Sequence, residues 1–239
     1  MRTPRLRVTH VLALAVPLIF AAGCARQTVL RPGPDADEVS WMEQAAVEEV
    51  DDVRIVAQVD TWPGDPDVET HVTPVRVVVE NDSDQPVRLR YQEFALIAAD
   101  GSRFAALPPY AVEGEVTDRT IVEHPQPMSD PMFEYRRFTV ASYTGPVYPT
   151  LGKYEGRFVY DPYYYHYYQD YWVDYELPTV TMLEHAIPEG VIAPDGRVAG
   201  YLYFEPVPPE QSKVRFRADV VNASNGQMLG EVSIPFVVK

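Results

Sequence analysis

VRVVVENDSDQPVRLRYQEFALIAADGSRFAAL, residues 75–107, is the stretch of this chain that decides the fold. Apolar residues recur at every second position in 75–79 and again in 87–91. That period of two is typical of strands that place one face on a core and the other toward water. Turn-forming residues separate the apolar runs, at 81–86 and at Asp100-Gly101. The stretch therefore predicts consecutive antiparallel strands of a β-sandwich.

The rest of the chain extends this pattern on both sides of a long irregular middle. Asp195-Gly196 and Asn225-Gly226 are turn signals, and Pro235 indicates an edge position or a bulge in the last strand. Neither β-rich part, 53–107 or 196–239, has enough strands to close a core alone. We therefore predict a mainly β fold, a single immunoglobulin-like antiparallel β-sandwich over 53–239 with an irregular insertion at about 108–187. Further strands are expected at 53–59, 134–143, 198–204, 214–221 and 232–238.

Two short helices are expected outside the strands. Ser40 and Glu43 have the spacing of a capping box, which predicts a short helix within residues 40–52. Thr181 and Glu184 have the same spacing, and we expect one or two helical turns over 181–187. Residues 24–39 carry proline, glycine and charge without periodicity, so they are interpreted as a tether.

The N-terminal segment has the plan of a secretory signal. Three arginines precede an apolar run at 11–23, which is shorter than the roughly 20 residues that span a bilayer. The run ends in Ala21-Ala22-Gly23-Cys24, which resembles a bacterial lipoprotein signal, although that motif more often has a branched aliphatic residue at the position of Ala21. The resemblance implies a signal peptide over 1–23 and lipidation of Cys24. An ordinary signal peptide or an N-terminal helix is the alternative.

Charge limits the partners that this chain can bind. The formal charge is −15, and it becomes −18 without the three arginines that precede Cys24. Such a chain is not expected to bind nucleic acid or to attach to anionic lipid by charge, so membrane attachment requires acyl chains. Ala25 stands where aspartate tends to retain lipoproteins at the inner membrane. By that resemblance the expected location is the cell envelope, at the outer membrane facing the periplasm if the source is Gram-negative.

A tyrosine-rich run, YDPYYYHYYQDYW at residues 160–172, lies inside the insertion. As a helix it would place aromatic rings on more than one face, and tyrosine offers large contact area at low entropic cost. One interpretation is a surface that binds sugars, peptidoglycan or a protein; the other is a cover over an open end of the sandwich. The residues concerned are Tyr163, Tyr164, Tyr165, Tyr167, Tyr168, Tyr171 and Trp172.

Catalytic and metal-binding motifs are not evident. The sequence has no Gly-x-Ser-x-Gly elbow, no His-Glu-x-x-His motif and no glycine-rich phosphate loop, and its sole cysteine is Cys24. We therefore predict no catalytic residue, no metal and no cofactor, although the many carboxylates leave a glycan-active enzyme as an alternative. The candidates for acid–base chemistry are His71, His124, His166 and His185. The candidates for calcium binding are Asp60, Asp65, Asp67 and Glu69.

Residues 75–107 and 188–205 resemble the two characteristic segments of telokin-like immunoglobulin-like modules in bacterial lipoproteins and secreted proteins. The resemblance covers about a quarter of the chain, rests on turns and alternation, and does not include the tyrosine-rich run. It implies extracytoplasmic interaction rather than chemistry, and it carries over no functional residue. The expected function is a lipid-anchored, non-catalytic binding or adaptor module for an envelope protein or glycan. A passive structural lipoprotein is the alternative.

Overall fold

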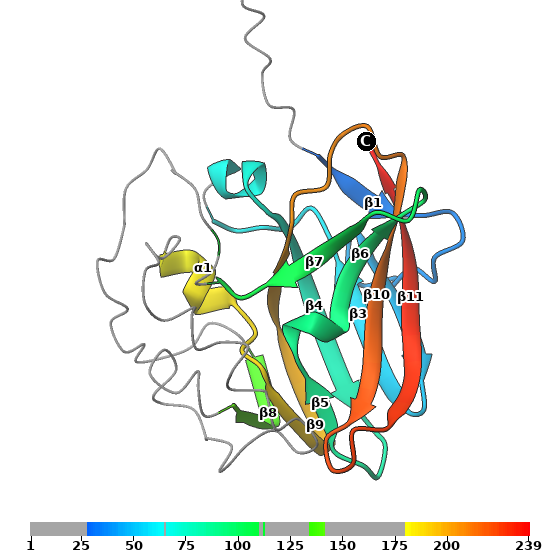
Figure 1. Ribbon diagram of the computed structural model, residues 1–239, viewed down its shortest axis with the longest axis vertical. Coiled ribbons are helices and arrows are strands. Elements are labelled where there is room, and N and C mark those ends of the chain that lie inside the picture. The colour runs from blue at the N-terminus through cyan, green and yellow to red at the C-terminus, as the bar shows by residue number, and fades with distance from the viewer. Residues whose placement is uncertain (1–27, 65, 110–111, 113–133, 142–179) are drawn as a thin grey trace, which may run out of the picture.

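The computed structural model describes residues 28–64, 66–109, 112, 134–141 and 180–239 (Figure 1). In these residues the regular elements are eleven strands, two short 3-10 helices and one α-helix. Their order is β1 Leu30–Pro32, β2 Ala45–Val50, β3 Val53–Gln58, η1 Pro66–Thr70, β4 Thr73–Asn81, β5 Val87–Leu89, η2 Tyr91–Glu93, β6 Phe94–Ala98, β7 Arg103–Leu107, β8 Glu134–Val140, α1 Val180–His185, β9 Gly190–Phe204, β10 Lys213–Asn222 and β11 Met228–Val238.

The strands form one antiparallel sheet that folds back on itself. Its order is β1-β11-β10-β6-β7-β9-β4-β3-β2, with β5 pairing both β10 and β9, and β8 pairing β9. In Figure 1, β3 and β4 lie behind β10 and β11, so the sheet makes two layers. The two ends of the sheet meet, because the Ser233 backbone N–H donates to Glu48 Oε2 at 2.6 Å. This contact helps to cover strand edges that would otherwise be open to other chains.

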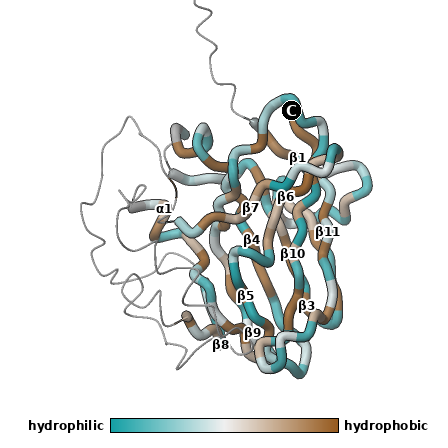
Figure 2. Tube along the Cα trace, in the orientation of Figure 1, coloured by the Kyte–Doolittle hydropathy of each residue, from teal (hydrophilic) through white to brown (hydrophobic). Residues whose placement is uncertain are grey.

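The core lies between the two layers. Side chains at every second position of β10 are buried, and the same alternation between apolar and polar residues is visible along the strands in Figure 2. Residues from both β-rich parts of the chain belong to one buried cluster, in which Phe204 and Phe216 pack with their rings 6.0 Å apart. The structure thus confirms the predicted fold class, a mainly β, antiparallel, sandwich-like architecture. Helix α1 overlaps the short helical segment expected at 181–187, and β8 lies within the strand expected at 134–143.

The helix expected over residues 40–52 is wrong, because its second half is strand β2. Gln44, Asp51 and Asp52 have φ angles of 57°, 51° and 58°, which interrupt a helix and place turns before and after β2.

The tether expected over residues 24–39 is also too long. Leu30 is buried in the core from β1, and the Val39 N–H donates to the Ala45 carbonyl at 3.0 Å. Apolar side chains within this proline-rich stretch are buried against the sheet.

The turn expected at Asp195-Gly196 is also wrong, since β9 continues through it. Asp195 has a φ of 57°, and β9 changes partner there, pairing β5 through residues 190–192 and β4 through residues 196–204. A positive-φ residue inside a strand is a bulge rather than a chain reversal. Pro235 lies beside the end of β1, which pairs only residues 236–238, and its carbonyl accepts the Gly33 N–H at 2.9 Å.

Candidate functional site

The outer face of strands β2, β3, β4 and β9 carries an apolar row where the alternation would place polar residues. Val47 lies opposite Val56, Val56 opposite Val78, and Val78 opposite Ala199, so the four side chains share one line across the sheet. Val39 and Met42, from the segment before β2, pack against this row. The outer face of this layer is therefore partly covered by the chain itself.

The cover is incomplete and leaves a groove of about 270 Å³. One wall is the segment that leads into β2, and the floor is the apolar row with the charged residues next to it. A groove with an apolar floor and a few polar groups is the usual form of a ligand site. The lining residues are Glu38, Val39, Ser40, Trp41, Met42, Val47, Arg54, Val56, Val78, Glu80 and Arg197.

Trp41 stands at the wall of this groove with 78% of its surface exposed. It is the most exposed large apolar side chain in the described part of the chain, ahead of Met228 and Tyr135. Trp62, by contrast, packs its ring edge-on against the rings of Tyr201 and Tyr203, with ring centroids 5.1 and 5.6 Å apart. An indole held in water on a folded surface is typical of interaction sites.

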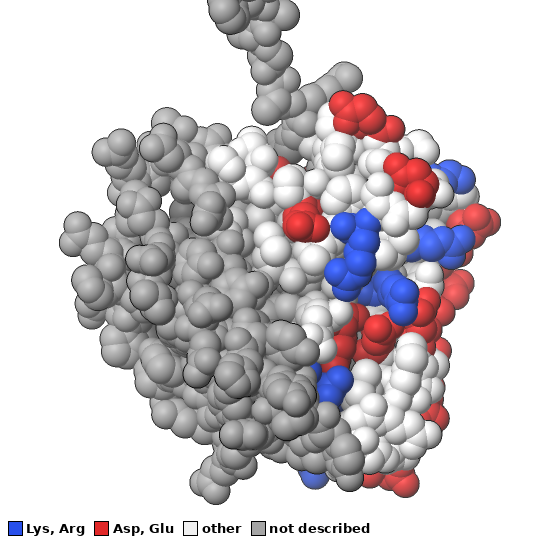
Figure 3. All heavy atoms as spheres, in the orientation of Figure 1, with Lys and Arg blue, Asp and Glu red and all other residues white. Residues whose placement is uncertain are grey.

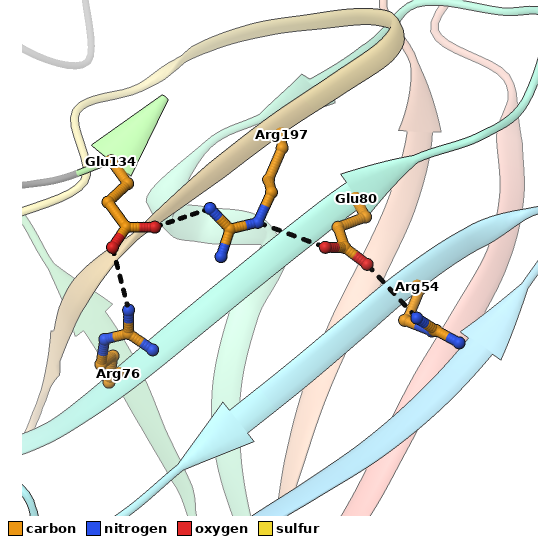
Figure 4. A network of polar contacts seen from close by, with 5 residues as sticks. All are labelled: Arg54, Arg76, Glu80, Glu134 and Arg197. Carbon is orange, nitrogen blue, oxygen red and sulfur yellow. Dashed lines mark hydrogen bonds and ion pairs between the residues drawn. The ribbon is translucent and has the colours of Figure 1, made fainter. Parts of the chain in front are cut away.

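A ladder of alternating charges borders the apolar row (Figure 4). Register places Glu49, Arg54, Glu80 and Arg197 opposite one another on four neighbouring strands. Arg54 Nη1 lies 3.4 Å from Glu80 Oε2, and Arg197 Nε donates to Glu80 Oε1 at 3.2 Å. Glu80 therefore joins two guanidinium groups at the edge of the groove.

The ladder continues from Arg197 to strand β8. Arg197 Nη1 donates to Glu134 Oε2 at 2.7 Å, and Arg76 Nη2 lies 3.9 Å from Glu134 Oε1. The hydrogen bond from Arg197 holds the pKa of Glu134 below its ordinary value, against the opposing effect of partial burial. Glu134 is thus charged at neutral pH. Exposed ion pairs contribute little to stability, so the main effect of the ladder is to fix the direction of these side chains.

The lining of the groove combines charged and aromatic groups. It offers guanidinium donors and carboxylate acceptors beside an aromatic surface, and it includes no histidine, cysteine or serine–histidine pair. Within the described residues, no group of three or more His, Cys, Asp or Glu side chains is arranged to hold a metal ion. In that same part of the chain, no helix is long and apolar enough to cross a membrane.

Of the candidates named from the sequence, those within the described residues do not line this groove. Cys24, the seven tyrosine and tryptophan residues of the 160–172 run, and the candidates His124 and His166 lie outside the described residues. His185 belongs to α1, where its Nδ1 lies 3.0 Å from the Thr181 carbonyl oxygen and its ring packs against Trp62. Asp60 lies 3.8 Å from Arg31 in an ion pair. Glu69 belongs to η1 and His71 follows it, and neither residue lines the groove.

The sequence does not predict the groove, because Trp41 belongs to the segment expected to be a helix. A local signal existed nonetheless, since Val56 and Val78 occupy positions that the alternation assigns to water. Apolar residues on both faces of a strand indicate that both faces are covered. Comparison of the whole chain with protein-family models, curated proteins and solved structures found no match.

Proposed function

We propose that this chain is a lipid-anchored protein of the cell envelope, attached through Cys24, whose sandwich is a non-catalytic binding module. The groove beside Trp41 is its binding surface, and a glycan strand is its ligand. The observation that carries this proposal is an indole with 78% of its surface exposed, next to a groove with an apolar floor.

Glycans suit the two kinds of surface that meet in this groove. The flat face of Trp41 can stack on the apolar face of a sugar ring, and aromatic side chains supply large contact areas of this kind. Arg54 and Arg197 are donors and Glu80 is an acceptor for sugar hydroxyl groups. Charges of both signs at the edge favour a ligand rich in hydroxyl groups over a strongly charged one.

The whole-chain charge supports the same choice of ligand. A formal charge of −15 disfavours polyanions such as nucleic acids at any surface of this protein. On the face seen in Figure 3, a group of basic side chains near the middle of the described part is bordered above and below by acidic side chains. An extended, uncharged or zwitterionic polymer of the envelope meets no such electrostatic penalty.

Co-sedimentation with purified peptidoglycan sacculi tests the proposal. We expect the mature protein to pellet with sacculi and Trp41→Ala to lose at least about tenfold in affinity, since a buried aromatic anchor is commonly worth 2 kcal/mol or more. Trp41→Phe should retain part of the binding, because it keeps an aromatic ring. Met228→Ala is the matched control, as Met228 is also exposed but belongs to β11.

Thermal melts of each variant separate binding from folding. Trp41 is mostly exposed, so Trp41→Ala should melt within a few degrees of the parent. If Trp41→Ala pellets as the parent does, the groove is not the glycan site. If the parent does not pellet at all, the result favours the alternative, a structural lipoprotein without a specific ligand.

A further inference from the structure

The folded domain begins only four residues after Cys24. The Thr28 hydroxyl donates to the Val207 carbonyl at 2.7 Å, and the Lys239 N–H donates to the Val29 carbonyl at 2.9 Å. Leu30 is then buried in the core, and β1 pairs with the end of β11. Residues 28 and 29 are therefore each held to the folded domain by a hydrogen bond.

The chain between Cys24 and Thr28 sets an upper limit on the distance from the anchor. Consecutive Cα atoms lie 3.8 Å apart, so four steps reach at most about 15 Å in any conformation. That reach is roughly half the length of β10, which has ten residues at about 3.3 Å each. A lipid attached at Cys24 therefore cannot leave the domain free to turn over above the membrane.

One end of the sandwich surrounds Thr28, and we name it the anchor end. Thr28, Asp60 and Glu69 lie around one small surface hollow there. The loop before β10 belongs to the same end, because the Val238 N–H donates to the Ser212 carbonyl at 3.0 Å. In Figure 1 this end carries the start of β1 and the C-terminus, while the β10–β11 turn lies at the opposite end.

Exposed acids lie at both ends, and those at the anchor end include Asp60, Asp100 and Glu210, whereas the described lysines lie at the anchor end alone. Two of the three lysines in the chain, Lys213 and Lys239, are exposed at the anchor end. The opposite end presents exposed aspartates on two turns that touch, since the Asp82 N–H donates to the Asp52 carbonyl at 2.9 Å. The exposed acids there are Asp51, Asp52, Asp82 and Asp84.

We infer that the anchor end is a membrane-apposed surface that rests on phospholipid headgroups, with the opposite end directed away from the bilayer. This inference depends on the proposed lipidation of Cys24. The short connection holds the anchor end within reach of the headgroups. In this orientation Lys213 and Lys239 lie within reach of lipid phosphates, but acids lie at both ends, so the short connection and not the balance of charge sets the orientation.

Fluorescence transfer to labelled lipid tests this orientation in the complete lipidated protein. Cys24 is the only cysteine and is acylated in that form, so one introduced cysteine gives one labelling site. Ser212→Cys and Ser224→Cys are a matched pair of exposed serines at the two ends of β10. The protein is purified from membranes and inserted into vesicles of phosphatidylethanolamine and phosphatidylglycerol with a headgroup-labelled acceptor.

We expect transfer from position 212 to exceed transfer from position 224 several-fold. A matched variant with about 20 glycine and serine residues inserted between Gln27 and Thr28 has a connection that spans about 27 Å on average, and the difference should shrink. Equal transfer from both positions in vesicle-bound parent protein overturns the orientation while leaving the anchor intact. Protein that carries no acyl chain and does not float with the vesicles overturns both the anchor and the orientation.

Discussion

Asn81, at the end of β4, is a fully buried side chain whose amide uses both of its polar atoms. Its Nδ2 donates to the Gln85 carbonyl at 2.8 Å and to the Ile192 carbonyl at 3.1 Å. Its Oδ1 accepts from the backbone N–H and the hydroxyl of Ser83, at 3.2 and 2.6 Å. One residue thereby shapes the β4–β5 loop and ties it to β9 at the point where β9 changes partner.

Asn81→Asp should destabilise the fold, because a carboxylate cannot donate to the two carbonyl oxygens and would bury a charge against them. We expect a loss of at least about 2 kcal/mol in the free energy of unfolding, measured by urea titration. Asn225→Asp is the matched control, since the exposed Asn225 uses Oδ1 only as an acceptor for the Gln227 N–H. Its cost should stay below about 0.5 kcal/mol. Similar costs for the two variants would contradict the role given to Asn81.

Strand β9 connects the two layers of the sandwich. Its first residues pair with β5, which also pairs with β10, and its later residues pair with β4. The positive φ of Asp195 lets one strand serve both layers, and Arg137 of β8 has a φ of 51° beside it. Arg137 Nη1 lies 3.3 Å from Asp195 Oδ2, so the irregular residues of the two strands are joined.

Gly196 is required at this bulge because the backbone passes too close for a side chain. A Cβ atom there would lie 2.5 Å from the Ala193 carbonyl oxygen and 2.7 Å from Ile192 Cγ2. Gly196→Ala should therefore cost about 1–3 kcal/mol in the free energy of unfolding. Gly33→Ala is a milder comparison, since its Cβ would come no closer than 3.2 Å, to the Pro235 carbonyl oxygen. Equal stability of Gly196→Ala and the parent would show that the bulge can move.

The two β-rich parts of the chain stabilise each other through one core. β10 and β11 pair over nine residues, and β10 pairs with β6 while β9 pairs with β4. The inward side chains of β11, among them Val232, Ile234 and Phe236, are at most 1% exposed. Burying one such side chain is worth roughly 1.5–3 kcal/mol, whereas whole domains are stable by only about 5–15 kcal/mol.

Deletion of residues 231–239 should therefore unfold the domain, which far-ultraviolet circular dichroism and thermal melting would show. The deletion removes most of β11, including the residues that pair with β1. Val237→Ala is a control within the same segment, because Val237 is only partly buried and faces away from Phe236. A cooperative melt of the truncated protein near the temperature of the parent would mean that the remaining strands close a core without β11.

Much of this architecture can be predicted from local sequence patterns, namely alternation and turn residues. Alternation at 75–79, 87–91 and 214–221 predicts strands because a pleated backbone sends successive side chains to opposite faces, whatever the partner. Asn225-Gly226 likewise predicts its hairpin, since Gly226 takes the positive φ of 71° that the turn needs. These features depend on neighbours in sequence, so fold class and most strands could be predicted.

Other features depend on residues that are distant in sequence. Residues 40–52 carry a helix-capping spacing, yet pairing of β2 with β3 and burial of Ala46 outweigh it. Asp195-Gly196 has turn chemistry, but β4 and β5 hold both sides of it in one strand. The groove exists only because Val39 and Met42 fold over an apolar row assembled from four strands. Contacts between residues distant in sequence decide which strands pair, in which register, and which sheet face is covered. Local periodicity carries no information about such contacts.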